Sequence, residues 1–149
     1  MKSFLLSLTA VCLFLNTVKA QYNLVNNAIV GASACGSNQC YRLTAASASQ
    51  RGAIWTQSMI DLSQSFDYTF CLNLGSNNGG ADGMVFVLQN MNNNTVGTNG
   101  GTLGYDIYTN SSVAVEFDTW DNGPTKGDIP ADHISINYNA NQAHAFQMG

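Results

Sequence analysis

The sequence predicts an all-β protein, an antiparallel β-sandwich formed by one domain. Charged residues make up only 9% of the 149-residue chain, against about 25% in a typical globular domain. The polar residues are mostly Asn, Ser, Thr, Gln and Gly, which favour turns and strand edges. No stretch has the helical repeat of polar and apolar residues that an amphipathic helix needs. Short apolar segments instead alternate with polar turns, a pattern typical of two packed antiparallel sheets.

Six segments are predicted as strands, and two of them carry the clearest patterns. Apolar and polar residues alternate along 65–74, which predicts a half-buried strand, whereas 83–89 is almost continuously apolar and predicts a buried one. The other predicted strands are 41–44, 52–56, 113–119 and 133–138. The tail, 139–149, is polar and shows no closing signal. Because sandwich domains often run to about 200–250 residues, we expect the sandwich to be incomplete at its C-terminus.

The first 20 residues are predicted to be a signal peptide and 21–149 a partial domain. Lys2 gives a positive start, 4–15 is apolar, and Val18-Lys19-Ala20 resembles a small-residue cleavage site. The apolar run is too short to span a bilayer. We therefore expect a secreted or cell-surface protein without membrane insertion.

Cleavage before Gln21 would leave three basic and nine acidic residues, a net charge of −6. Such a surface disfavours nucleic acid and anionic lipid as partners and favours cations. In an oxidising compartment one disulfide is expected, either Cys35–Cys40 or Cys40–Cys71, with one thiol left over.

The stretch 113–122 carries the strongest functional signal. Because side chains alternate along a strand, Glu116 and Asp118 project from one face with Cα atoms roughly 6.6 Å apart. Trp120 and Asn122 continue that face, whereas Val115 and Phe117 are expected to point into the core. Two carboxylates so close together require a proton or a cation between them.

The loop that follows adds Asp128, Asp132 and His133. Hard cations prefer carboxylate, amide and carbonyl oxygens, and a transition ion also accepts imidazole. The residues thus indicate a pair of adjacent ions. A solvated acidic edge that binds nothing is the alternative, but a half-buried Glu116 would need its charge compensated.

Several motifs resemble those of the legume (L-type) lectins, in a form closer to bacterial surface proteins than to seed lectins. The metal-binding segment is matched by V-A-V-E-F-D-T-W-D-N at 113–122 and D-I-P-A-D-H-I-S-I at 128–136. Upstream, A-D-G-M-V-F-V at 81–87, G-G-T-L-G at 100–104, Y-R-L-T at 41–44 and S-F-D-Y-T-F at 65–70 follow in the family's order. The resemblance implies a concanavalin-like jelly roll that binds glycans with calcium and manganese, and it is compatible with a homo-oligomer.

The resemblance also implies a role for each site residue. The metal ligands would be Glu116 and His133 on manganese or another transition ion, Asp118 and Asp128 bridging both ions, and Asn122 and the Trp120 carbonyl on calcium. The sugar contacts would be Asp82 as acceptor, the Gly101 N–H and Asn122 amide as donors, and the Trp120 ring. The Ala81–Asp82 peptide would be cis. Ile129-Pro130 departs from the family's direct Asp-Pro, so Asp132 is an alternative to Asp128.

Two other functions remain open at this point. A glycoside hydrolase of the same fold could use Glu116 and Asp118, but a third carboxylate would fall at Trp120 or at Asp121, which faces away. We therefore expect no enzyme. A calcium-stabilised adhesion module without a sugar site is the other alternative.

Overall fold

The computed structural model describes residues 21–31 and 40–148, and over these it confirms the all-β prediction. The strands are β1 (Tyr22–Asn26), β2 (Ile29–Val30), β3 (Tyr41–Arg42), β4 (Gly52–Thr56), β5 (Gly83–Leu88), β6 (Val113–Asp118), β7 (His133–Tyr138) and β8 (Asn141–Met148), with one 3₁₀ turn, η1 (Pro124–Lys126). The described residues form no helix long and apolar enough to cross a membrane. The predicted signal peptide lies outside them.

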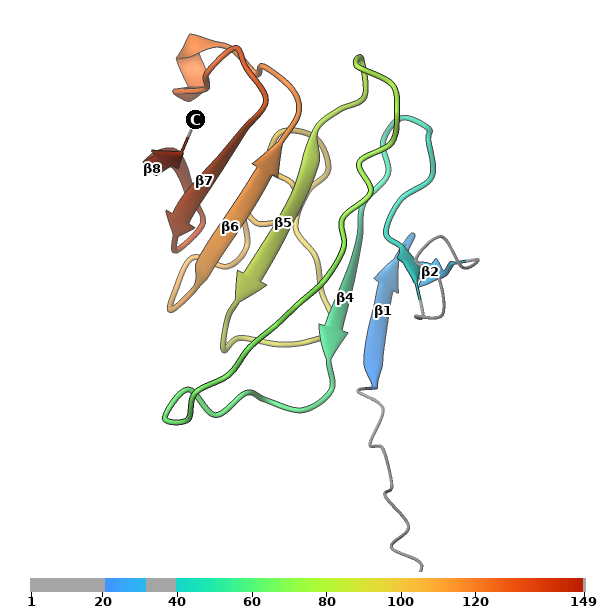
Figure 1. Cartoon of the computed structure of the whole chain (residues 1–149), viewed down its shortest axis with the longest axis vertical. Coiled ribbons are helices and arrows are strands. Elements are labelled where there is room, and N and C mark those ends of the chain that lie inside the picture. The colour runs from blue at the N-terminus through green and yellow to red at the C-terminus, as the bar shows by residue number, and fades with distance from the viewer. Residues whose placement is uncertain (1–20, 32–39, 149) are drawn as a thin grey trace, which may run out of the picture.

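The strands pair antiparallel in three sheets: β1 with β4, β2 with β3, and the four strands β5-β6-β7-β8 in sequence order (Figure 1). In the four-stranded sheet, Gly83 of β5 lies opposite Asp118 of β6, and Asp118 lies opposite His133 of β7. The C-terminal end of β6 therefore lies beside the first residues of β5 and β7, at one end of the sheet.

The two faces of the four-stranded sheet differ in burial. Directly opposed residues share a face, so Val85, Ala114, Glu116, Ser135 and Asn137 lie together on what we call the inner face. A loop following β5 covers this face and provides its core. Tyr105 and Tyr108, each 1% exposed, pack there with Ala114.

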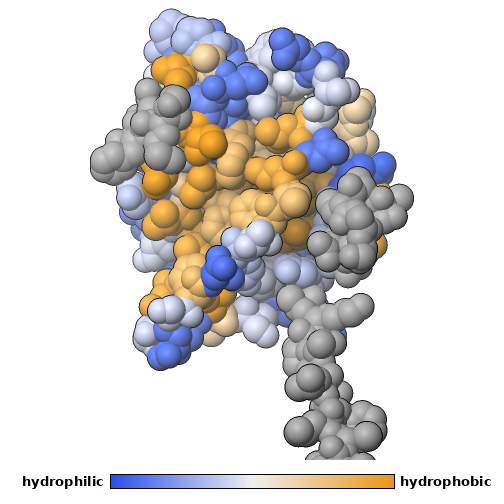
Figure 2. Space-filling model, viewed as in Figure 1, coloured by the Kyte–Doolittle hydropathy of each residue, from blue (hydrophilic) through white to orange (hydrophobic). Residues whose placement is uncertain are grey.

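The opposite, outer face is apolar and more exposed (Figure 2). The expectation that Val115 and Phe117 point into the core was wrong for the described residues. Both are only half-buried, whereas Glu116 and Asp118 on the inner face are 2% and 5% exposed. The reason is that the tyrosine-bearing loop packs on the inner face, so the carboxylates rather than the apolar side chains of β6 are shielded from water.

The predicted strand 65–74 is extended chain without strand pairing in the described structure. It runs between β5 and β4 in Figure 1, and its aromatic rings contact the outer face, where Phe70 stacks on Phe86 with ring centroids 5.3 Å apart. The segment is exposed along its whole length, with Phe70 46% exposed, so the prediction of a half-buried strand was wrong. A strand also needs a neighbour for its ladder of hydrogen bonds, and apolar alternation cannot supply one.

Most other strand predictions are confirmed, and the main omission lies in the tail. The bounds of β4 and β7 match the prediction, and β3, β5 and β6 are each shorter by one or two residues. Unlike the predicted buried strand, β5 is half-buried along its whole length. The tail forms β8, which pairs with β7. Asn139 and Ala140 connect the two strands with φ angles of 52° and 59°. Two successive positive φ values are typical of a tight type I′ hairpin turn.

The cysteine alternatives are narrowed by the described residues. Cys40 and Cys71 are not joined to each other, so the Cys40–Cys71 alternative is wrong. Cys35 lies outside the described residues, and the Cys35–Cys40 alternative stays a prediction.

Candidate metal centre

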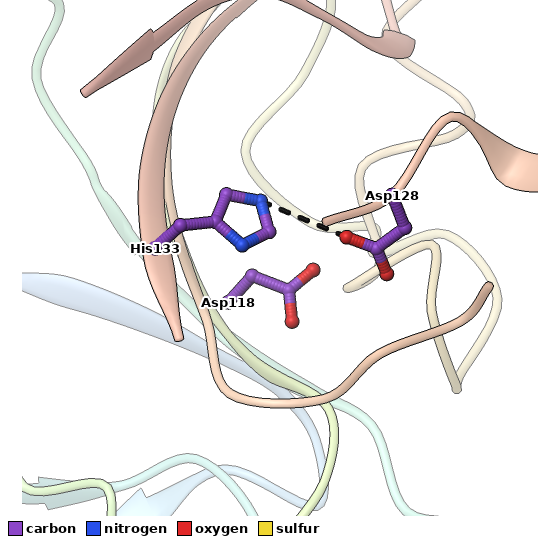
Figure 3. Close-up of side chains that lie close together, drawn as sticks. All are labelled: Asp118, Asp128 and His133. Carbon is purple, nitrogen blue, oxygen red and sulfur yellow. Dashed lines mark ion pairs between the residues drawn. The ribbon is translucent and has the colours of Figure 1, made fainter. Parts of the chain in front are cut away.

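Three potential metal ligands converge at the end of the sheet where β6 terminates. Asp118 ends β6, His133 begins β7, and Asp128 comes from the loop between them. One ligand atom from each residue lies within 4.8 Å of the other two. The three side chains point toward one another in Figure 3. Asp118 is 5% and His133 6% exposed, so water screens their charges only weakly.

The loop conformation brings Asp128, and not Asp132, into this cluster. The Asp128 carboxylate accepts hydrogen bonds from the backbone N–H of Asn122 at 2.6 Å and of Ile129 at 2.8 Å. Gly127, at φ 73°, closes η1 with a left-handed residue, a conformation that glycine adopts without strain. Asp132 is exposed and outside the cluster. The structure therefore favours Asp128 of the two alternatives.

The imidazole of His133 is oriented for coordination. Its Nδ1 lies 2.9 Å from the backbone carbonyl of Ala131, and because a carbonyl only accepts, Nδ1 carries the proton. Nε2 faces the Asp128 carboxylate at 3.8 Å. In the neutral ring, the Nε2 lone pair is then directed toward the carboxylates, and this is the arrangement that ligating histidines adopt.

A pocket of about 240 Å³ extends from this cluster and contains a third carboxylate, that of Glu116. The residues lining it are Gly101, Thr102, Glu116, Asp118, Asn122, Lys126, Asp128 and Gln142. Gly101 packs so closely on Asn122 that an added Cβ would collide with the Asn122 side-chain amide. Gln142 donates from Nε2 to the Gly101 carbonyl at 3.2 Å. The pocket is therefore lined by carboxylates on the side of the cluster and by the side-chain amides of Asn122 and Gln142.

The accumulated negative charge acts on Asp118. Burial raises the pKa of its carboxyl above the ordinary value, and the Asp128 and Glu116 carboxylates raise it further. The Trp120 N–H, which donates to Asp118 Oδ1 at 2.7 Å, and His133 lower that pKa. A cation among these groups would offset the repulsion. Carboxylate oxygens with one imidazole nitrogen are donors that suit calcium and a transition ion such as manganese.

The chain matches the family model for the legume lectin beta-barrel domain over residues 15–148. It belongs to the legume lectin family. A lectin domain of this family indicates carbohydrate binding, and the family is generally non-enzymatic and typically binds calcium and manganese.

The remaining predicted residues of the lectin site lie at the same end of the sheet, outside the lining of the pocket. Asp82 immediately precedes β5, and its carbonyl accepts a hydrogen bond from the Thr119 N–H at 3.0 Å. The Ala81–Asp82 peptide is cis, as the resemblance implies. Trp120 follows β6 and is 45% exposed. Its ring is accessible to a ligand.

Sequence reasoning missed several residues of this site. Thr102, Lys126 and Gln142 reach the pocket only through loop and hairpin geometry, which no local pattern reveals. Ser135 and Asn137 contact Glu116 on the inner face. Their two-residue spacing from His133 on one strand was a usable signal, because such residues share a face.

The raised pKa of Asp118 predicts that protons would compete with a cation at this candidate metal centre. Cation affinity should fall as the pH is lowered through the raised pKa, since Asp118 must lose its proton to bind metal. The stability of the metal-free domain, in contrast, should increase as the pH is lowered through the same range. The native state holds the Asp118 proton to higher pH than the unfolded chain, so this contribution is full below about pH 3.9 and is lost as the pH rises through the raised value. Calcium titrations across pH 4–7 would measure the pH dependence of cation affinity, and melting curves in EDTA over the same range would measure that of stability. A cation affinity that does not change with pH would contradict the prediction.

Proposed function

We propose that this lectin domain binds glycans at a calcium-dependent site at the end of β6. The observation that carries the proposal is the convergence of Asp118, Asp128 and His133 within 4.8 Å, in a pocket that also contains Glu116 and Asn122. A group of buried, like-charged ligand atoms with one oriented imidazole is hard to account for without bound cations.

Two cations would share the pocket. Glu116 and His133 would hold a transition ion such as manganese, because only that side of the cluster offers a nitrogen. Asp118 and Asp128 would bridge both ions, and calcium would take further oxygens from Asn122 and the Trp120 carbonyl. The bound ions would neutralise the carboxylates and rigidify the loop that carries Asn122.

The sugar would bind beside the ions, at the rim of the pocket. Asp82 would accept hydrogen bonds from hydroxyl groups, and the Gly101 N–H and the Asn122 amide would donate, since a sugar offers both donors and acceptors. The exposed Trp120 ring would cover the apolar face of the pyranose. The close contact between Gly101 and Asn122 supports this arrangement, because it places the two proposed donors side by side.

The predicted signal peptide supports a location outside the cell or on its surface. N-terminal sequencing of the exported protein should find Gln21 first.

The proposed function is tested by a glycan array probed with the full chain in calcium and manganese, and again in EDTA. Binding should be lost in EDTA and restored by calcium. Asp82→Ala should abolish glycan binding while calorimetry still shows cation uptake. The control is Asp67→Ala, at an exposed aspartate that does not line the pocket, and it should change neither glycan binding nor cation uptake. Glycan binding that survives both EDTA and Asp82→Ala would overturn the proposal. Cation uptake without any glycan binding would instead favour an adhesion module, and new reducing ends from soluble glucans would favour a hydrolase.

A further inference from the structure

Glu116 is held by a buried hydrogen-bonded network on the inner face of the sheet. Its Oε2 accepts hydrogen bonds from Ser135 Oγ at 2.9 Å and from Asn137 Nδ2 at 2.5 Å. Asn137 Nδ2 also donates to Ser135 Oγ at 3.2 Å. Glu116 is 2% exposed, and Ser135 and Asn137 are 0% exposed. The three side chains form a closed triangle that is almost completely buried, and only Glu116 also lines the pocket.

The sheet itself sets the geometry of this triangle. Ser135 lies directly opposite Glu116 in the β6–β7 register, and Asn137 follows two residues later on the same face. Both donors come from β7, the strand that begins with His133. A shift of one residue in register would turn both donors to the outer face. Strand pairing therefore determines which two side chains of β7 face Glu116.

The Asn137 amide is oriented with its nitrogen toward Glu116. Its nitrogen donates two of the three hydrogen bonds of the triangle, while its Oδ1 is buried and accepts no hydrogen bond from the described residues. A buried acceptor without a donor is unfavourable. The flipped amide would be worse, because Oδ1 would then face the Glu116 carboxylate, which also only accepts. The Glu116 charge thus dictates how Asn137 is turned.

We propose that Ser135 and Asn137 are positioning residues for the metal centre. By saturating Oε2 they would fix the rotamer of Glu116 toward the pocket that it lines together with Asp118 and Asp128. The inference rests on the proposed function, since it concerns the same cations. Outer-shell partners of this kind orient a ligand before the metal arrives, and their loss typically weakens metal binding about 10–100-fold.

The test is calorimetric titration of manganese into the metal-free full chain. Ser135→Ala and Asn137→Leu are each expected to weaken manganese binding about 10–100-fold. Ser112→Ala removes another buried serine hydroxyl, one that donates to the Tyr108 carbonyl, and is expected to leave manganese affinity unchanged. Melting curves in EDTA report separately whether each variant folds. If Asn137→Leu does not fold, Ser135→Ala, which deletes a single oxygen atom, still decides.

A double-mutant cycle separates positioning from a general structural effect. If Asn137 acts through Glu116, Asn137→Leu should weaken manganese binding in the wild type but add less than about twofold in the Glu116→Gln background. An equal effect in both backgrounds, or wild-type affinity in both single variants, would overturn the proposal. Wild-type protein that takes up no cation would overturn the proposed function itself, and that result is read from the wild-type titration alone.

Discussion

Replacing Asp118 by asparagine is expected to weaken divalent-cation binding by more than about 100-fold. This exceeds the loss of metal affinity that removing an outer-shell partner usually causes, because Asp118 is proposed to contact the cations directly. Asp118 is the carboxylate on which the charges of Asp128, Glu116 and His133 all act. An asparagine would keep an oxygen for the Trp120 N–H but remove the charge that a cation needs. Glycan binding should disappear together with cation binding.

The same Asp118→Asn substitution should stabilise the metal-free protein. Removing a buried charge beside two other carboxylates relieves repulsion, so we expect the melting temperature in EDTA to rise by roughly 2–4 °C, the shift that about 1 kcal/mol produces in a chain of this size. Asp132→Asn, on the same loop but exposed, is the matched control and should change neither quantity. Cation affinity within threefold of wild type in Asp118→Asn would contradict the assignment of the metal centre.

Replacing Tyr108 by alanine should cost about 3–5 kcal/mol of unfolding free energy. Tyr108 is 1% exposed and packs in the core with Tyr105 and Ala114. Its ring also meets Trp55 edge-on, with centroids 5.4 Å apart. Alanine would leave a cavity at the point where the loop is packed against the sheet and against β4.

Tyr108→Phe is the control that separates packing from hydrogen bonding. The Tyr108 hydroxyl donates to the Thr95 carbonyl at 2.7 Å, but Trp55 Nε1 donates to the same carbonyl at 2.8 Å. The carbonyl therefore keeps a partner, and the loss should be only about 0.5–1.5 kcal/mol. Urea denaturation of both variants gives the two free energies. Equal losses would mean that the hydroxyl, and not the ring, stabilises this core.

The sequence alone determined the fold class, the family and which two carboxylates of the candidate site share one face of β6. Because strand alternation is a local property, the pattern of residues along 113–119 was sufficient to place Glu116 and Asp118 on one face of a strand. The order of the motifs identified the legume lectin family. The bounds of β4 and β7 followed from the same local patterns.

Only the tertiary structure decided what depends on distant residues. The conformation of the loop after β6 selected Asp128 over Asp132, and packing by Tyr105 and Tyr108 made the carboxylate face of β6 the buried one. Pairing with β7 turned a polar tail into β8, whereas 65–74 formed no ladder because alternation does not provide a partner strand. Burial, loop closure and strand pairing each depend on a second segment of chain, and a local pattern contains no information about that segment.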